Sequence, residues 1–359
     1  MKADTIVVGA TDRPGGSARP YPPSWLDRAY DGLEGLPGPT WLAYLVLAVV
    51  SVLLANSAVW LSGLRPIGDV EPAQVGWGVA TAVLLAASHR LRVVAGAAFD
   101  SFRPALGSGI ADPERARYEI TVMSARPILL ITIFSFVITP AYYVVDPVAS
   151  QVVGLTPLGF VPRIITEGAT SAILLGVLYQ AIRQMRIVSR LHDAADRIDP
   201  FRPAPLYAFS RLTSQAGLVL IGFNVLGMVL NPAMFESSAA LTIFAPWLIG
   251  FTLVAVAVFA VPLLGMHRRL EDEKDRVEGA ADGRMRDLLG ELNEAIDARA
   301  TDRVEALDRT ISALRHELEI LAKLPTWPWS TGTIRGFGSA LFLPLVLFLI
   351  QRYLGGLLG

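Results

Sequence analysis

The chain has 359 residues, of which 53% are hydrophobic and only 18% charged, and its formal net charge is −1. Together with a mean hydropathy of +0.48, this composition excludes an ordinary soluble domain and predicts a membrane protein. The absence of cysteine excludes disulfides, thiolate metal sites and thiol nucleophiles. The balanced charge offers no basic face for a nucleic acid.

Residues 1–40 are rich in proline, glycine and charge, and they lack an apolar core. A cleavable signal peptide needs such a core, so none is expected. We interpret this segment as an N-terminal cytoplasmic arm that is partly disordered, up to about Pro20.

Seven apolar segments follow the arm. A helix needs about 20 apolar residues to cross about 30 Å of hydrocarbon, where no water satisfies the backbone. The segments that meet or approach this length are 41–61, 75–94, 127–145, 164–182, 212–230, 241–266 and 337–354. The sequence therefore predicts an all-α, polytopic membrane protein with seven transmembrane helices.

The connections between these segments alternate between arginine-rich and arginine-poor. The N-terminal arm and the segments after the second, fourth and sixth spans are rich in arginine. Of the other three connections, the first contains only Arg65, the second contains only Arg163, and the third contains no arginine. Because Lys and Arg are retained on the cytoplasmic side, this pattern predicts a cytoplasmic N-terminus and an exterior C-terminus in the plasma (inner) membrane.

The fourth span is expected to continue into the cytoplasm as a helix, to about residue 198. Helical spacing places five apolar residues on one face of this extension: Ile182, Met185, Val188, Leu191 and Ala195. Prolines at 200, 203 and 205 then end the helix.

Residues 267–324 are polar, helical in pattern and free of proline, and they predict a cytoplasmic helical hairpin or platform. Spacings of three and four define a seam of Val304, Leu307, Ile311, Leu314, Leu318 and Leu321. An earlier stripe comprises Met285, Leu288, Leu289, Leu292 and Ile296.

The chain must return to the membrane on the same side, so the two stripes belong to two helices. We predict a turn near 300–302, with Asp302 and Glu305 as a capping pair. The alternative is a turn at 279–283. The stripes either cover each other within one hairpin, or the seam packs against other subunits and holds an oligomer together.

The segment 325–359 leads back into the bilayer. Pro325 stops the preceding helix, Trp327 and Trp329 are expected to anchor the chain at the membrane interface, and Ser330 or Thr331 to cap the last span. A position between a cytoplasmic helix and a membrane helix also suits a mechanical coupler.

Residues suited to catalysis are scarce. The four histidines stand singly near helix ends, where such side chains are mostly solvated, and their spacing does not suit a metal site: His89, His192, His267 and His316. No glycine-rich phosphate loop is present, and no lysine lies within a span to form a retinal Schiff base. We therefore expect no enzyme, no cofactor and no metal centre.

Carboxylates near membrane depth occur only at the outer ends of the third and fourth spans, at Asp146 and Glu167. Either both are simply hydrated, or they line an outward-open vestibule with Tyr142, Tyr143 and Thr170, where a ligand or cation binds. The deeper amides are expected to hydrogen-bond between helices.

The last span contains Pro344-Leu345, an apolar run over 346–350, and Gln351. In insect odorant and gustatory receptors the last span carries a Thr-Tyr pair, five apolar residues and a Gln, of which this chain matches the apolar run and the Gln. The seven spans, the cytoplasmic N-terminus and the prolonged fourth and sixth helices also resemble that family in layout. The tail is similar to bacterial multi-pass membrane proteins.

The resemblance implies a tetrameric, ligand-gated cation channel whose cytoplasmic helices form the assembly platform. Its last span would line the pore, with Pro344, Phe348 and Gln351 as candidate pore residues.

We accordingly expect a homo-oligomeric ion channel or a ligand-responsive membrane sensor, with an unidentified small ligand. One alternative is a monomeric or dimeric transporter of small molecules or lipids, suggested by Pro140, Pro262 and Pro344 as kinks within spans. Another is a membrane scaffold whose hairpin docks a cytoplasmic partner. The chain divides into the arm 1–40, a six-span bundle 41–266, the hairpin 267–324 and the final segment 325–359.

Overall fold

A computed structural model describes residues 19–145, 154–195, 207–230, 238–323, 326, 327, 329 and 331–358. These residues form ten α-helices and no strand. Seven of the helices are long and apolar enough to cross a membrane: α2 (Thr40–Leu61), α3 (Pro72–Leu106), α5 (Ala125–Val145), α6 (Pro157–Asp193), α8 (Ala208–Leu230), α9 (Ser238–Asp297) and α11 (Thr331–Leu358). The chain is thus a multi-pass, all-α membrane protein, and the predicted fold class is confirmed.

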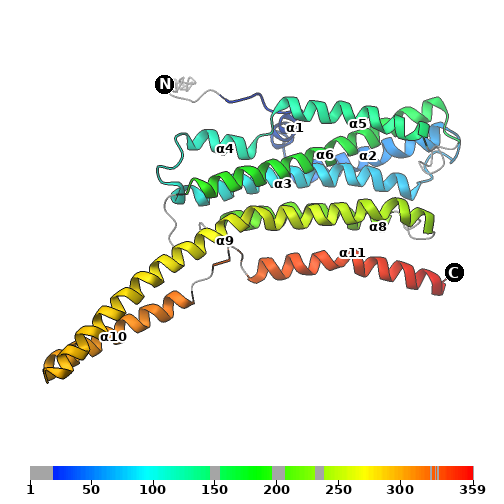
Figure 1. The fold of residues 1–359 in the computed structure, drawn as a ribbon. Coiled ribbons are helices and arrows are strands. Elements are labelled where there is room, and N and C mark those ends of the chain that lie inside the picture. The colour runs from blue at the N-terminus through cyan, green and yellow to red at the C-terminus, as the bar shows by residue number, and fades with distance from the viewer. Residues whose placement is uncertain are drawn as a thin grey trace, which may run out of the picture.

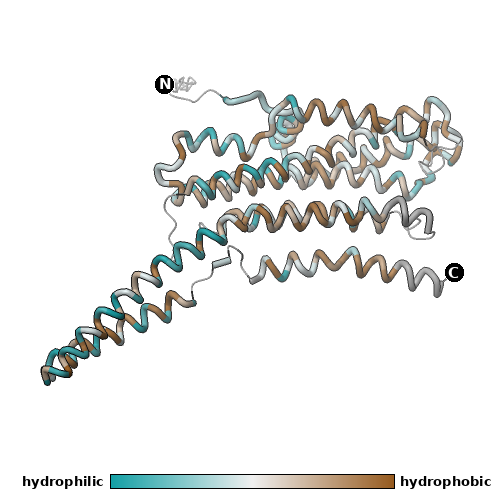
Figure 2. The backbone as a smooth tube through the Cα atoms, viewed as in Figure 1, coloured by the Kyte–Doolittle hydropathy of each residue, from teal (hydrophilic) through white to brown (hydrophobic). Residues whose placement is uncertain are grey.

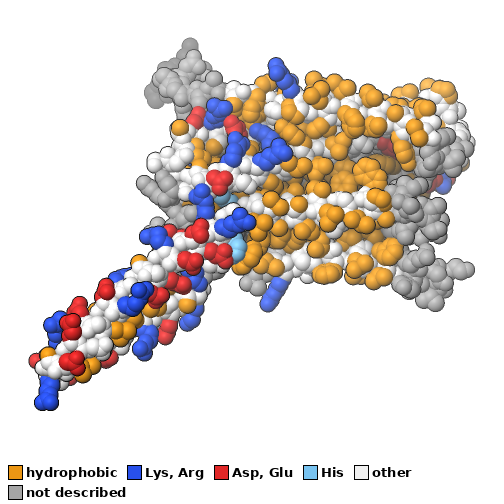
Figure 3. Space-filling view, viewed as in Figure 1, with side chains coloured by type: hydrophobic (Ala, Val, Ile, Leu, Met, Phe, Trp, Pro, Cys, Tyr) orange, Lys and Arg blue, Asp and Glu red, His pale blue; other side chains and the backbone are white. Residues whose placement is uncertain are grey.

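Three further helices lie outside the spans: α1 (Trp25–Glu34), α4 (Pro113–Thr121) and α10 (Thr301–Ala322). Figure 1 shows the long helices running side by side, with α3 and α6 in the middle of the bundle and α11 along one edge. Apolar residues dominate the bundle, and polar residues gather on the hairpin that leaves it (Figure 2). The space-filling view shows the same division, with charges at one end of the bundle and along the hairpin (Figure 3).

We call this end, at which α3 and α6 finish and α9 leaves the bundle, the basic end. It carries the arginine-rich segments, and the arginine pattern predicts that it faces the cytoplasm. α3 runs 12 residues past the predicted span, to Leu106, because Phe99 and Phe102 bury the extension in the core. α6 ends at Asp193, short of the predicted residue 198, because the backbone turns at Ala194 and its N–H bonds to Arg190 and His192. Residues 196–206, with their three prolines, lie outside the described residues.

The predicted hairpin is present. α9 is one helix of 60 residues that leaves the bundle, and α10 packs back along it. The chain reverses at Ala298–Ala300, where Arg299 has a φ of 54°. The predicted turn near 300–302 is therefore confirmed, whereas 279–283 lies within α9. The capping pair was wrong: Ala300 is the N-cap of α10 and no side chain caps it.

The N-terminal arm contains α1, a helix that sequence reasoning missed. Ser24 caps it, and Ser24 and Asp27 form a capping box. The Asp27 carboxylate also accepts a hydrogen bond from the backbone N–H of Met123 at 3.0 Å. Asp27 is 1% exposed, so one buried carboxylate ties the start of α1 to the segment between α4 and α5.

Asp27 is expected to make stability depend on pH. Burial raises the pKa of its carboxyl above 3.8, against the opposing effect of the Ser24 hydrogen bond and the Arg92 charge. The folded state therefore binds the proton more tightly than the unfolded chain does. This contribution to stability is fully present below about pH 4 and is lost as the pH rises through the folded-state pKa.

Thermal unfolding should be measured from pH 4 to pH 8. The unfolding midpoint of the wild type should fall more steeply with rising pH than that of Asp27→Asn, whose amide does not ionise. Asp31→Asn, at a half-exposed carboxylate on the same helix, is the matched control and should keep the wild-type slope. Equal slopes for the wild type and Asp27→Asn would contradict the prediction.

Candidate functional site

One face of α6 carries a row of buried polar side chains in the centre of the bundle. Spacings of three and four place Arg163, Glu167 and Thr170 on this face, followed by Gln180 and Gln184. α2, α3 and α5 cover it. The helix starts early because Thr156 caps it and Pro157 occupies its first turn.

Arg163 and Glu167 form an ion pair, with 2.5 Å between Nε and Oε1, and their side chains are only 5% and 9% exposed. The Arg163 Nε also donates to the hydroxyl of Tyr143 on α5 at 3.1 Å. The prediction that Arg163 lies in a connection was therefore wrong, because α6 begins before it. The expectation that Glu167 is simply hydrated was also wrong.

One turn further along α6, two hydroxyls meet between neighbouring helices. Thr170 on α6 lies 2.6 Å from the Thr81 hydroxyl on α3, and both side chains are buried. We call Tyr143, Arg163, Glu167, Thr170 and Thr81 the Arg163 cluster. Because a charged side chain within a membrane is costly, such a cluster is a candidate functional site.

A second polar group lies nearer the basic end. Tyr30 of α1 donates to the Ser88 hydroxyl at 2.6 Å, Ser88 donates to Gln180 Oε1 at 2.5 Å, and the Gln180 amide donates back to the Ser88 carbonyl at 3.2 Å. The neighbouring His89 lies 2.8 Å from the Tyr44 hydroxyl and 2.7 Å from Glu34. The amide of Gln180 thus bonds between helices, as predicted.

Between the two polar groups, the α6 face is apolar. Ile173 and Val177 are buried there, in the core of the bundle. The Arg163 cluster is therefore separated from the Ser88 group by an apolar layer, and the described polar side chains do not form one continuous path along α6.

The predicted vestibule residues are not brought together on one surface. Tyr142 is 46% exposed, whereas Tyr143 faces Arg163 inside the bundle. Glu167 and Thr170 are buried with it, and Asp146 lies outside the described residues. The i, i+4 spacing of Arg163 and Glu167 was the available signal for the pair that sequence reasoning missed.

The two predicted interface tryptophans belong to a stack of five rings. Trp327 stacks on His267 of α9 with 3.7 Å between ring centroids, and on Trp329 at 4.8 Å. Trp329 stacks on Phe259 of α9 at 5.1 Å, and Phe259 stacks on Phe337 of α11 at 4.0 Å. This aromatic stack connects the base of the hairpin to the last membrane helix.

The stack is reinforced by polar contacts at His267. Its Nδ1 donates to the Thr326 carbonyl oxygen at 3.0 Å, and its Nε2 lies 3.3 Å from Glu271. Trp327 is 42% exposed, whereas Trp329 is partly buried against the core. Interface anchoring thus suits Trp327, and Trp329 packs between α9 and α11.

α11 touches the rest of the bundle along one stripe. Phe337 is buried against Gly217 of α8, and Leu341 packs on the same core. Pro344 and Phe348 follow on this stripe at helical spacing and are half-buried. The side chain of Gln351 lies outside the described residues. Of the candidate pore residues, Pro344 and Phe348 are thus turned toward α8.

The predicted seam of α10 lies against α9. Leu307, Ile311, Leu314 and Leu321 are buried, while Val304 and Leu318 are half-buried. Leu314 and Leu321 pack with Ala281 of α9, and Met285 and Leu288 of the earlier stripe lie beside them. Within one chain the two stripes therefore cover each other, although Leu289 and Ile296 stay exposed.

The described residues hold no group of three potential metal ligands. Three histidines differ from the expectation that they are solvated. His89 is 7% exposed, His192 is fully buried between Phe102 and Phe209, and the His267 side chain is 13% exposed. No protein-family model, curated protein or solved structure matches the chain.

Proposed function

We propose that the protein is a homo-oligomeric membrane channel, in which α11 helices from several copies meet around a shared path and the α9–α10 hairpin controls their position. The observation that carries this proposal has two parts. Few residues of the last helix are buried against the rest of the bundle, and ring stacking holds the start of that helix to the base of the hairpin. Only 6% of an 18-residue window within Gly332–Ile350 is buried, against 56% in the corresponding windows of α3 and α6. The aromatic stack holds the start of α11 to α9.

The outward side of α11 supports contact with another copy. Gly336 is exposed, and a Cβ added to it would meet nothing within 4 Å. Small residues on an open helix face allow a second membrane helix to approach closely. The free stripe of α11, opposite the α8 contact, comprises Ser339, Phe342, Val346 and Leu349. Such a stripe would form a largely apolar constriction, of the kind that gates by dewetting.

A cysteine scan tests this proposal directly, because the wild-type chain has no cysteine. In planar-bilayer recordings, the wild type should give unitary currents that a charged, membrane-impermeant thiol reagent leaves unchanged. The same reagent should block most of the current of Phe342→Cys and Val346→Cys. Oxidised Gly336→Cys should run as a covalent dimer in non-reducing gels.

Leu253→Cys is the matched control. Leu253 lies on α9, is apolar and is 64% exposed, so it tests a side chain that faces outward from a different helix. Reagent should leave its current unchanged. A wild type without unitary currents, or equal block of Leu253→Cys and Val346→Cys, would overturn the channel proposal.

The Arg163 cluster favours a second candidate function, a transporter of small molecules. Buried ionisable side chains in membrane proteins commonly belong to substrate or ion pathways, and Glu167 faces Arg163 and lies on one helix with Thr170. A protein that runs as a monomer, gives no unitary currents and still moves a solute into liposomes would favour this alternative.

A further inference from the structure

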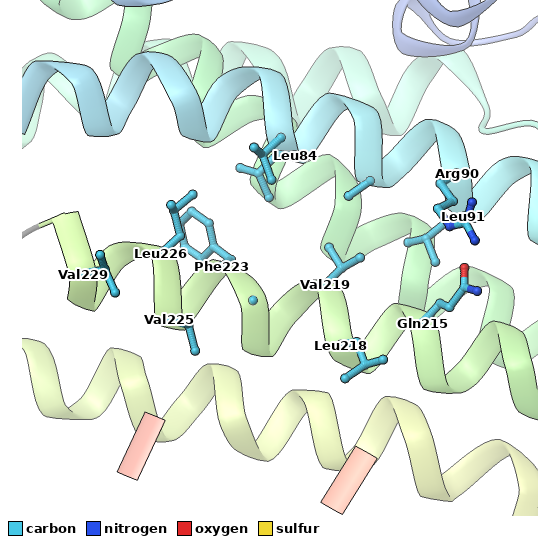
Figure 4. Close-up of a pocket in the computed structure, with 13 residues that line it drawn as sticks. Leu84, Arg90, Leu91, Gln215, Leu218, Val219, Phe223, Val225, Leu226 and Val229 are labelled. Carbon is cyan, nitrogen blue, oxygen red and sulfur yellow. The ribbon is translucent and has the colours of Figure 1, made fainter. Parts of the chain in front are cut away.

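An apolar groove of about 510 Å³ runs between α3 and α8 (Figure 4). Its walls are aliphatic and aromatic along most of its length, with Leu84 on α3 and Phe223, Leu226 and Val229 on α8. Gly222 also lines the groove, and a Cβ added there would meet nothing within 4 Å. The groove is therefore open space beside that glycine.

Polar side chains line the groove only at one end. Figure 4 shows Arg90 of α3 and Gln215 of α8 facing each other there. Among the described residues, no carboxylate pairs with Arg90, and the Oε1 of Gln215 is buried without a hydrogen-bond partner. Arg211, one turn before Gln215 on α8, is exposed and likewise has no carboxylate partner within the described ranges.

These polar groups lie at the depth of lipid headgroups. Arg90 follows Pro72, the first residue of α3, by 18 positions, which is about 27 Å along a helix and close to the roughly 30 Å of a hydrocarbon core. From Gln215 to Val229 the groove follows α8 for 14 positions, about 21 Å. That length exceeds the half-thickness of the core.

We propose that this groove binds an anionic phospholipid from the leaflet at the basic end. One acyl chain lies along the apolar walls, and the phosphate is held by the guanidinium groups of Arg90 and Arg211. Guanidinium is the side chain that best matches phosphate geometry. This inference does not rest on the channel proposal.

Charge complementarity argues for a lipid with a negative headgroup over a neutral one. Lys or Arg near an anionic membrane surface contributes about 1 kcal/mol each. Here Arg90 lines the groove end, Arg211 lies one turn before Gln215 on the same face of α8, and no described acid pairs with either. A headgroup that adds a choline cation would place like charges beside Arg90.

The test uses the whole protein in detergent with defined lipids added, read by native mass spectrometry. Phosphatidylglycerol, which has a phosphate and hydroxyls, should bind at least about tenfold more tightly than phosphatidylcholine. The Arg90→Gln/Arg211→Gln double variant should lose this preference. Arg126→Gln, at an exposed arginine of α5, should keep it.

The apolar walls are tested separately. Gly222→Trp should fill the groove and weaken binding of both lipids, whereas Gly250→Trp, at an equally open glycine of α9, should bind as the wild type does. Equal affinity of the wild type for both lipids would overturn the proposal without any variant. Undiminished binding in Gly222→Trp, or an unchanged preference in the double arginine variant, would also overturn it.

Discussion

Replacing Glu167 by leucine is expected to destabilise the protein by about 3–5 kcal/mol, because the substitution leaves the Arg163 guanidinium buried without its carboxylate. Arg163 and Glu167 are each less than a tenth exposed, and Nε and Oε1 are 2.5 Å apart. The double variant Arg163→Met/Glu167→Leu should recover most of the loss, since it removes both charges and fills the space with apolar side chains. Thermal unfolding in detergent, followed by circular dichroism, measures both effects.

An exposed ion pair provides the matched control. Asp69 pairs with Arg65 at 3.0 Å, and both side chains are more than a third exposed. Asp69→Leu should therefore cost no more than about 1 kcal/mol. The prediction would be contradicted by a double variant as unstable as Glu167→Leu, because the loss would then not come from an unpaired charge. It would also be contradicted by a Glu167→Leu variant as stable as the wild type, because the buried pair would then contribute nothing to the free energy of unfolding.

Gly78→Ala is expected to produce a second large effect, because the backbones of α2 and α3 are in close contact there. An added Cβ would lie 2.5 Å from the Val52 Cα and backbone nitrogen and 2.7 Å from its Cγ2. Backbone atoms do not move aside as a flexible side chain does, so the two helices must separate. Overpacking of this kind costs about 1–3 kcal/mol, and occasionally more. The midpoint of thermal unfolding should fall.

Gly250→Ala should change stability in the opposite direction. Gly250 lies within α9, and a Cβ there would meet nothing within 4 Å, so alanine gains helix propensity, worth up to about 1 kcal/mol, without a clash. If Gly78→Ala and Gly250→Ala had the same midpoint of thermal unfolding, the result would contradict the close contact of α2 and α3 at Gly78.

The seven spans could be predicted because crossing a membrane imposes a length and an apolar composition on each segment. The turn near Arg299 could be predicted because two apolar stripes cannot lie on one helix that must also return. The start of α6 could not be found in the same way, since its first turns carry Arg163 and Glu167 and the apolar run begins between them. Thr156 and Pro157 were the local signals for it.

The candidate site was harder to predict than the spans, because it depends on which helices become neighbours. Nothing in the sequence near Trp327 indicates that its ring meets His267, which is 60 positions earlier. Likewise, the period of α11 defines a stripe through Pro344 and Phe348, but only the packing of Phe337 against Gly217 shows that this stripe faces α8. Hydropathy alone does not distinguish a helix face that meets protein from one that meets lipid.

α9 carries the hairpin far from the membrane bundle. Leu263, Met266 and Leu270 still pack in the core of the bundle, and from Glu271 to Asp297 the helix extends 26 more positions, about 39 Å. If the hairpin controls α11 as proposed, this length would act as a lever arm, and a small lateral force at the Arg299 tip would become a larger force at the aromatic stack beside Phe259 and α11.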